Sequence, residues 1–226
     1  MTTSEPDLQD PYTAPHFATS ALITIDVQRD FLSEAPYGVP GTTEILPALR
    51  RAVSAFRAAG RPVVHVVRLY EDGGGDADLV RRRLLKSGVR IAAPGTAGSE
   101  PADGILPEAA PALDSALLLS GRPQRLGPHD YAVFKPRWGA FHRTCLEELL
   151  HELAVDTLVF AGCNLPNCPR ASIVQASERD FRVALVRDAV SRVTDSALTE
   201  LAGIGVHLLN ADALEGRLAE PSQGTG

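Results

Sequence analysis

Long apolar runs and an excess of basic residues are missing from this 226-residue sequence. No run approaches the roughly 18 apolar residues that a membrane-spanning helix requires. The first twenty residues contain neither lysine, arginine nor an apolar stretch, so we expect no secretory signal. With 22 basic and 28 acidic residues, the formal net charge is −6, which is poorly suited to broad binding of phosphate backbones. We therefore expect neither a membrane nor a nucleic-acid partner.

Cysteine is also scarce, with Cys145, Cys163 and Cys168 as the only three. An odd and small number of cysteines, in a chain without an export signal, argues against a disulfide framework. We accordingly expect the protein in the reducing cytoplasm. At least one thiol is then free, either to do chemistry or to fill space in the core.

The overall composition is that of an ordinary globular protein, with 44% apolar and 22% charged residues. The length and the apolar content suffice for one domain with a substantial core. Residues 1–19 are polar and contain three prolines, and we expect a flexible arm there. We predict a single domain over residues 20–214, followed by a flexible tail over residues 215–226.

Apolar runs of strand length alternate along the chain with segments of helical periodicity. Such alternation predicts βαβ units and a mostly parallel sheet covered by helices on both faces. Residues 89–129 are less regular, and we expect a long excursion with a short helix near 108–116. The expected strands are 21–27, 62–69, 131–135, 157–161, 183–186 and 206–209, and the expected helices are 45–59, 77–86, 144–153, 169–181 and 195–202.

Parallel sheets of this kind bind ligands beyond the carboxyl ends of their strands. Cys168 follows such a strand and directly precedes Pro169, which suits the first position of a helix. We therefore expect Cys168 at the helix N-cap, where the helix dipole lowers the pKa of a thiol and free N–H groups can hold an oxyanion. The alternative is that Cys168 is a small apolar filler.

Two further strands end in charged residues, Asp26 and Lys135. The Asp26 carboxylate could accept a thiol proton as a general base, and the Lys135 ammonium would favour nearby anions. Taken alone, each has an ordinary explanation: an aspartate that caps backbone N–H groups, and a solvated lysine. Together with Cys168 they form a nucleophile, a base and a cation at one edge of the sheet.

Three motifs in order resemble the isochorismatase-like cysteine hydrolase superfamily, which includes nicotinamidases and N-carbamoylsarcosine amidase. ALITIDVQRDFL (21–32) is similar to its opening motif, and VFKPRWGAF (133–141) to its lysine motif. LVFAGCNLPNCPRASIVQASERDF (158–181) is similar to the nucleophile segment, in which the cysteine follows a glycine by six residues, here Gly162 and Cys168. The resemblance covers about residues 20–212.

The resemblance implies a Rossmann-like three-layer α/β/α fold with Asp26, Lys135 and Cys168 as the catalytic residues. It also implies a cis peptide bond between Cys163 and Asn164, and an oxyanion hole made of the backbone N–H groups of Asn164 and Cys168. Relatives are commonly oligomeric, which implies a homodimer or homotetramer here.

A cysteine at the nucleophile position favours cleavage of a C–N bond over hydrolysis of a vinyl ether. The resemblance thus implies hydrolysis of a small amide, carbamoyl compound, cyclic imide or lactam through a thioester. The region 68–79 holds no histidine where nicotinamidases carry metal ligands, so we predict no metal and no cofactor. The alternatives are a catalytically lapsed binding or scaffold member, and a redox protein that uses Cys163 and Cys168.

The walls of the substrate pocket are expected from residues near the same strand ends. Trp138 could stack on a planar substrate or pack in the core, and Arg68 could bind a substrate carboxylate or pair at the surface with Glu71 or Asp72. The basic residues of 81–90 are interpreted as a solvated helix face. The expected pocket residues are Gln28, Phe31, Arg68, Tyr70, Trp138 and Phe141.

Overall fold

A seven-stranded sheet forms the centre of the computed structural model, which describes residues 10–219. The strand order is β3-β4-β2-β1-β5-β6-β7, and all neighbours are parallel except β3 with β4. The strands are β1 Ser20–Ile25, β2 Val63–Val67, β3 Gln124–Arg125, β4 Asp130–Phe134, β5 Thr157–Gly162, β6 Arg182–Val190 and β7 His207–Leu209.

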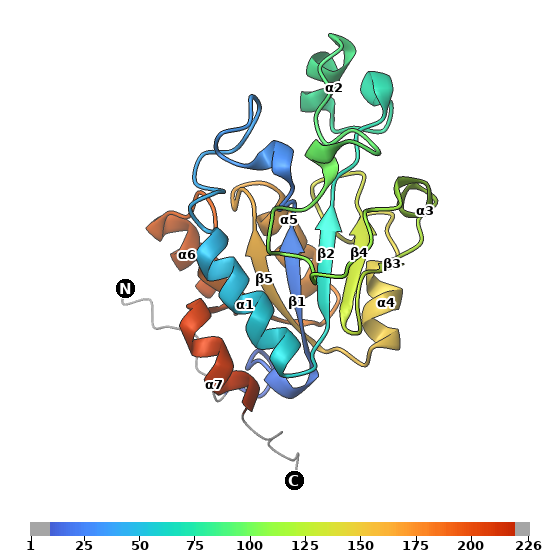
Figure 1. Ribbon diagram of the computed structural model, residues 1–226. Helices are drawn as coiled ribbons and strands as arrows, with labels where there is room; N and C mark the ends of the chain where they lie inside the picture. Colours follow the sequence, from blue (N-terminus) through green and yellow to red (C-terminus); the bar gives the residue numbers. More distant parts are fainter. Residues whose placement is uncertain (1–9, 220–226) are drawn as a thin grey trace.

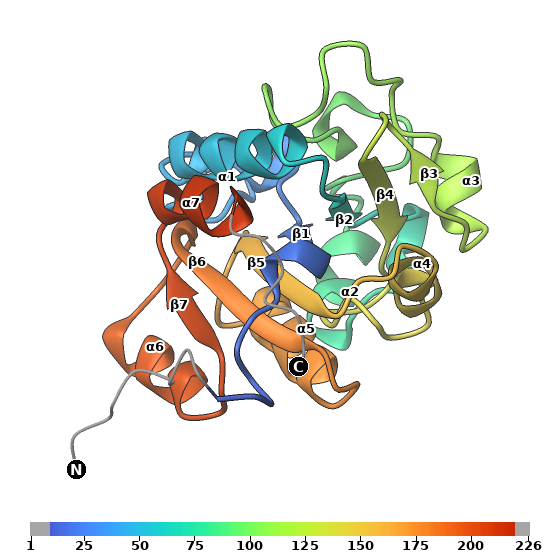
Figure 2. The same ribbon diagram turned by 90° about the horizontal axis from the view of Figure 1, so that it is seen from below.

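Helices cover both faces of the sheet, which confirms the expected three-layer α/β/α architecture. The helices are α1 Leu46–Ala58, α2 Leu79–Lys86, α3 Ser115–Leu119, α4 Leu146–Glu152, α5 Cys168–Ser177, α6 Asp195–Ala202 and α7 Leu214–Ala219. Short 3₁₀ turns occupy 17–19, 29–31, 72–74, 97–99 and 211–213. Figure 2 shows α1 and α7 on one face and α4, α5 and α6 on the other.

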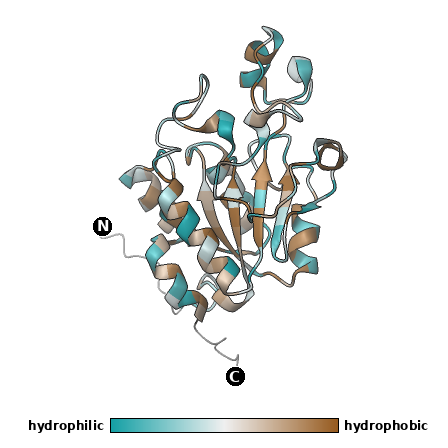
Figure 3. Cartoon of the chain, viewed as in Figure 1, coloured by the Kyte–Doolittle hydropathy of each residue, from teal (hydrophilic) through white to brown (hydrophobic). Residues whose placement is uncertain are grey.

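The alternating side chains of β1 explain why both faces are covered. Leu22 packs into the core beneath α1 and α7, whereas Ile23 and Ile25 pack into the core beneath α4, α5 and α6. Every residue of β1 is buried, as expected for a parallel strand inside a three-layer fold. Figure 3 shows the hydrophobic colour running through the central strands, while α1 and α7 alternate between hydrophilic and hydrophobic residues.

The domain extends further at its carboxyl end than the expected boundary at residue 214. Residues 214–219 form α7, whose Leu214 and Leu218 are buried against the core that also contains α1. These two leucines bury enough apolar surface to hold the segment as a helix, so the expectation of a flexible tail is wrong for 215–219. The remainder of the expected tail lies outside the described residues.

The described part of the amino-terminal arm is also attached to the domain. His16 pairs with Asp156 at 2.7 Å, and the Arg182 guanidinium donates to the carbonyl of Pro11 at 2.9 Å. The arm was expected to be flexible over residues 1–19. Residues 10–19 instead follow the surface near the amino ends of β5 and β6, and residues 1–9 lie outside the described part.

The excursion over residues 89–129 contains a helix, but later in the chain than expected. The sequence favoured a helix near 108–116, whereas α3 begins only after Asp114, whose side chain accepts a hydrogen bond from the N–H of Leu117. Pro107 and Pro111 disfavour a continuous helix before that cap. The excursion then forms β3, the one antiparallel edge strand of the sheet.

Helix α2 stands above the carboxyl ends of the strands (Figure 1). Asp78 is its N-cap residue, and the helix begins two residues later than the expected start at residue 77. Helix α2 therefore lies at the same edge of the sheet as the carboxyl ends of the strands. Within residues 10–219, no helix combines the length and the apolar character needed to cross a membrane.

We expect Gly162→Ala to lower the free energy of unfolding by about 3 kcal/mol, as measured by urea denaturation. Gly162 has a φ of +124°, and an added Cβ would lie 2.6 Å from the backbone nitrogen of Ile25 and closer still to its carbonyl oxygen. The control is Gly216→Ala in α7, where nothing lies within 4 Å of the added Cβ, and where alanine should stabilise the helix slightly. Equal stability of the two variants would contradict this account.

Candidate active site

Four strands that are neighbours in the sheet bring their ends together at one edge. Asp26 follows β1, Arg68 follows β2 and Lys135 follows β4, while β5 leads through a short loop to Cys168. Asp26 has a left-handed backbone with φ of +52°, a conformation that aspartate tolerates better than most residues. Asp26, Arg68 and Cys168 line one cavity, as the position of the strand ends predicts.

Asp26 and Lys135 form a buried ion pair. The Lys135 Nζ donates to Asp26 Oδ2 at 2.8 Å, and the Lys135 side chain is 0% exposed. The second carboxylate oxygen, Asp26 Oδ1, is buried and has no hydrogen-bond partner within the described part of the chain. Because buried acceptors are almost always satisfied, this oxygen is an acceptor without a donor in the resting protein.

Cys168 is the first residue of α5, and Asn167 is the N-cap residue. The expectation of Cys168 at the N-cap is therefore wrong by one position, because Pro169 occupies the second rather than the first helical position. The Cys168 N–H still has no acceptor among residues 10–219, as is usual in the first turn of a helix. Cys168 is 9% exposed and lines the cavity.

Burial raises the pKa of the Cys168 thiol to about 11, and the negative charge of Asp26 acts in the same direction. The positive charges of Lys135 and Arg68 lower the pKa, but they do not offset the other two effects. The expected depression of the thiol pKa by the helix terminus is thus wrong for the resting protein. At neutral pH the sulfur carries its proton, and a base must remove it before attack.

Arg68 approaches the thiol from the side of β2. Its Nη2 lies 3.8 Å from the Cys168 sulfur, and the residue is 2% exposed. Its Nη1 pairs with Asp78 at 2.9 Å and donates to the Pro136 carbonyl at 2.9 Å, and the guanidinium lies 5.3 Å from the Tyr70 ring centroid. The alternative of a surface pair with Glu71 or Asp72 is wrong, because Arg68 turns inward to Asp78.

The cavity has a volume of about 280 Å³. Four of the six expected pocket residues line it, and Trp138 is 41% exposed at its rim rather than packed in the core. The lining residues are Asp26, Phe31, Arg68, Tyr70, Val80, Arg81, Leu84, Trp138, Asn164, Asn167 and Cys168.

Gln28 and Phe141 were expected in the pocket wall, and neither lines the cavity. The Gln28 carboxamide accepts from the Arg68 N–H at 2.7 Å and donates to the carbonyls of Arg68 and Ser99. It therefore fixes the loop after β2. Phe141 packs in the core, with its ring centroid 5.9 Å from that of Phe181.

Helix α2 supplies wall residues that the sequence analysis missed. Val80, Arg81 and Leu84 face the cavity, although residues 81–90 were interpreted as a solvated helix face. Val80 and Leu84 are four residues apart and so lie on one side of the helix, and this apolar pair is the signal that could have indicated the cavity wall. Asn167, in the loop before Cys168, was also missed.

The expected oxyanion hole is only partly available. The Asn164 N–H donates to the Ser191 Oγ at 2.7 Å, so this donor is occupied. Residues 10–219 contain no cis peptide bond, which contradicts the expected cis bond between Cys163 and Asn164. Ser191 follows β6, next to β5, and its hydroxyl holds the Asn164 N–H in place. The Cys168 N–H remains the free donor of the expected pair.

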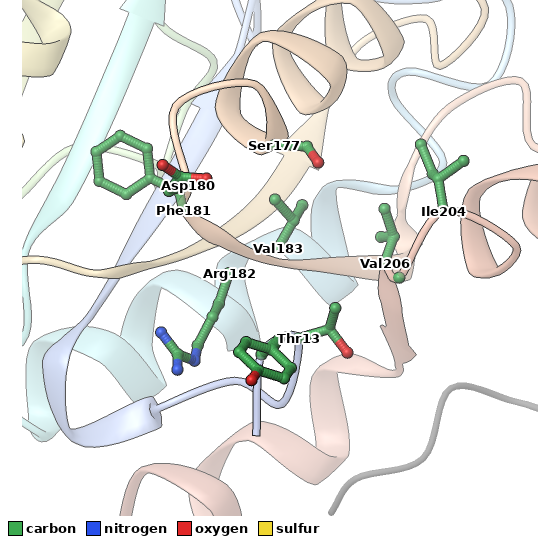
Figure 4. A pocket seen from close by; sticks show the side chains of 10 residues that line it. Thr13, Ser177, Asp180, Phe181, Arg182, Val183, Ile204 and Val206 are labelled. Carbon is green, nitrogen blue, oxygen red and sulfur yellow. The ribbon is translucent and has the colours of Figure 1, made fainter. Parts of the chain in front are cut away.

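Two larger cavities within residues 10–219 are lined by neither cysteine nor lysine. A cavity of about 420 Å³ lies at the opposite end of the sheet, near the amino ends of β6 and β7 (Figure 4). Its lining includes Asp180, Arg182 and Ile204 but no cysteine or lysine. Across residues 10–219 no three His, Cys, Asp or Glu side chains group as metal ligands, and the absence of a metal stays a prediction. All three cysteines are free thiols.

Comparison with known proteins identifies relatives over most of the chain. Residues 20–213 match the Isochorismatase domain family. An Arabidopsis thaliana protein named as a probable inactive nicotinamidase is 32% identical over 200 residues, 85% of this chain and 93% of that one. The ureidoacrylate amidohydrolase RutB of Methylobacterium radiotolerans is 26% identical over 243 residues, 97% of this chain and 84% of that one. The crystal structure of an isochorismatase family protein from Desulfovibrio vulgaris has a TM-score of 0.76 and 31% identity, covering 90% of this chain and all of that one.

We expect labelling of Cys168 by iodoacetamide to rise with pH without a plateau at or below the ordinary thiol pKa of 9.0, as followed by peptide mass spectrometry. Asp26→Asn removes a negative charge that raises this pKa, so the variant should label faster near neutral pH. Cys145, whose raised pKa owes nothing to Asp26, is the internal control and should not change. A plateau near neutral pH in the native protein would contradict the buried, protonated thiol.

Proposed function

The chain belongs to the isochorismatase family, and we propose that it is a cysteine-dependent amidohydrolase that cleaves the C–N bond of a small amide, carbamoyl compound, cyclic imide or lactam. One observation carries the proposal. A protonated thiol, Cys168, shares a cavity with a buried carboxylate oxygen, Asp26 Oδ1, that has no donor within the described chain. The carboxylate oxygen can accept a proton and the thiol can give one, so the two groups are suited to proton transfer.

The first half of the reaction forms a thioester. Asp26 takes the proton of Cys168 as the substrate carbonyl approaches, and the sulfur attacks the carbonyl carbon. The positive charges of Lys135 and Arg68 stabilise the thiolate as it forms, since both lower the pKa of this thiol. The Cys168 N–H, at the start of α5, donates to the developing oxyanion. The Asn164 N–H could join it only after leaving the Ser191 hydroxyl.

The first half ends when the tetrahedral intermediate collapses: its C–N bond breaks, the protonated Asp26 gives its proton to the leaving nitrogen, and the thioester remains. The second half releases the acid product. A water molecule gives a proton to Asp26 and attacks the thioester carbon, and the C–S bond breaks with return of the proton to the sulfur. The net reaction of a primary amide consumes one water and yields a carboxylic acid and ammonia.

Lys135 has a positional role throughout this cycle. Its contact with Asp26 Oδ2 orients the carboxylate and leaves Oδ1 as the oxygen that exchanges protons. A buried carboxylate without a cation would tend to protonate and lose its function as a base.

For the intact enzyme we propose a location in the reducing cytoplasm, which keeps Cys168 as a thiol. We also propose that the enzyme is a homodimer or homotetramer.

The second candidate is a catalytically lapsed binding member of the family. The name of the Arabidopsis thaliana relative, a probable inactive nicotinamidase, favours it. Against it stands the cost of the site. A buried ion pair with one unsatisfied oxygen lowers stability, and a protein that only binds gains nothing from it.

We expect wild-type protein to release ammonia or amine from at least one member of a panel of small carboxamides, carbamoyl compounds, cyclic imides and lactams. On that substrate Cys168→Ala should lower kcat/KM by at least about 10³-fold, and Asp26→Asn by about 10²- to 10⁴-fold. Cys145→Ala, at the start of α4, removes a thiol away from the cavity and should leave activity unchanged. Equal turnover by Cys168→Ala would reject the mechanism, and ligand binding without turnover by the wild type would favour the lapsed member.

A further inference from the structure

Helix α2 presents to the cavity one cation, Arg81, that forms no ion pair within residues 10–219. Arg81 is half-buried and lines the cavity between Val80 and Leu84. Over residues 10–219 no carboxylate lies within ion-pair distance of its guanidinium. Arg137 and Arg143, by contrast, both pair with Asp76.

The other charges of the cavity are balanced in pairs. Asp26 is matched by Lys135 at 2.8 Å, and Arg68 is matched by Asp78 at 2.9 Å. Arg81 therefore leaves the cavity with a net positive charge. A half-enclosed cavity of one sign attracts small molecules of the opposite sign.

A neutral donor accompanies Arg81. Tyr70 lines the same cavity, and its ring is held against the guanidinium of Arg68. Burial raises the pKa of Tyr70 to about 12, so the hydroxyl keeps its proton. The charge of Arg81 acts on this phenol, and the phenol donates no hydrogen bond to any residue in the described range.

We propose that Arg81 and Tyr70 bind an anionic group of the substrate, so that the preferred substrates are small amides carrying a carboxylate at the end remote from the scissile bond. A guanidinium and a hydroxyl together suit a carboxylate, since both are donors and the guanidinium can bind both oxygens at once. The proposal rests on the amidohydrolase function proposed above and names its substrate class. Monoamides of short dicarboxylic acids belong to this class.

The position of Arg81 relative to the nucleophile gives the charge a role in orientation. The reacting groups Asp26 and Cys168 come from the strand ends, whereas Arg81 comes from α2, which stands above them (Figure 1). A carboxylate held by α2 leaves the opposite end of the molecule directed at the sulfur. A neutral amide of the same length lacks this anchor and can bind in either direction.

The first test measures binding without turnover. Succinate, as a carboxylate probe, should protect Cys168 of the full chain from iodoacetamide, and Arg81→Met should weaken this protection by about 10- to 100-fold in succinate concentration. The matched control is Arg83→Met, which removes the same charge from an exposed position on α2 that does not line the cavity. Succinate should protect Cys168 of this variant as well as it protects Cys168 of the wild type. Tyr70→Phe should weaken protection less than Arg81→Met. The rate at which iodoacetamide labels Cys168 without succinate is measured for each variant, to check that the substitution leaves the active site folded.

The second test compares turnover of succinamate, the anionic monoamide, with that of succinamide, the neutral diamide. Wild-type kcat/KM should favour succinamate by about 10- to 100-fold, and Arg81→Met should abolish the preference by raising KM for succinamate alone. Equal protection in Arg81→Met and Arg83→Met, or no protection by succinate, would overturn the anion site even if amides are hydrolysed. Arg81-dependent protection without hydrolysis of these two amides or of any other compound of the panel above would leave the anion site standing and refute the amidohydrolase.

Discussion

The ion pair between Asp26 and Lys135 is buried at the sheet edge, and the rest of the site is arranged around it. The two residues follow β1 and β4, which are not neighbours, so the lysine reaches across the end of β2. Removing both charges from water costs several kcal/mol per ion, which a single contact at 2.8 Å offsets only in part. The pair holds one carboxylate oxygen and leaves the other facing the thiol cavity without a donor. The surrounding fold therefore stabilises an arrangement that is unfavourable by itself, and its three layers supply that stability.

Much of this arrangement follows from the sequence because the geometry of a parallel sheet is restrictive. Apolar runs that alternate with helical periodicity require parallel strands, and parallel strands carry their last residues to one edge. Asp26, Lys135 and Cys168 could therefore be predicted to lie together without any knowledge of their distances. The chain bounds of α6 were predicted without error, and the structure shows why the helix begins there: the Thr194 side chain accepts a hydrogen bond from the N–H of Ala197.

The remaining features depend on the direction in which each side chain points and on how deeply it is buried, and the local sequence encodes neither. Gln28 follows β1 by only three residues, yet its carboxamide turns into the loop after β2 because that loop offers both a donor and an acceptor. The basic face of α2 has the pattern of a solvated helix, and only the position of α2 above the strand ends brings Arg81 to the cavity. The pKa of Cys168 reflects burial and the charge of Asp26, which raise it, against the charges of Lys135 and Arg68, which lower it. The position of Cys168 before Pro169 indicates a helix start, whereas the depth of burial and the neighbouring charges follow only from the folded surroundings.

The high pKa of the Cys168 thiol has a consequence for the life of the protein between turnovers. Peroxides and other oxidants react with exposed thiolates far faster than with buried thiols, and they carry a cysteine to sulfinic and sulfonic acids that no ordinary reductant restores. A sulfur that keeps its proton until a substrate carbonyl arrives is shielded from this damage by the same burial that obliges Asp26 to deprotonate it. The buried position of Cys168 thus has two results: its sulfur resists oxidation, and Asp26 is needed to deprotonate it. Protection of this sulfur does not require a disulfide with a neighbouring cysteine.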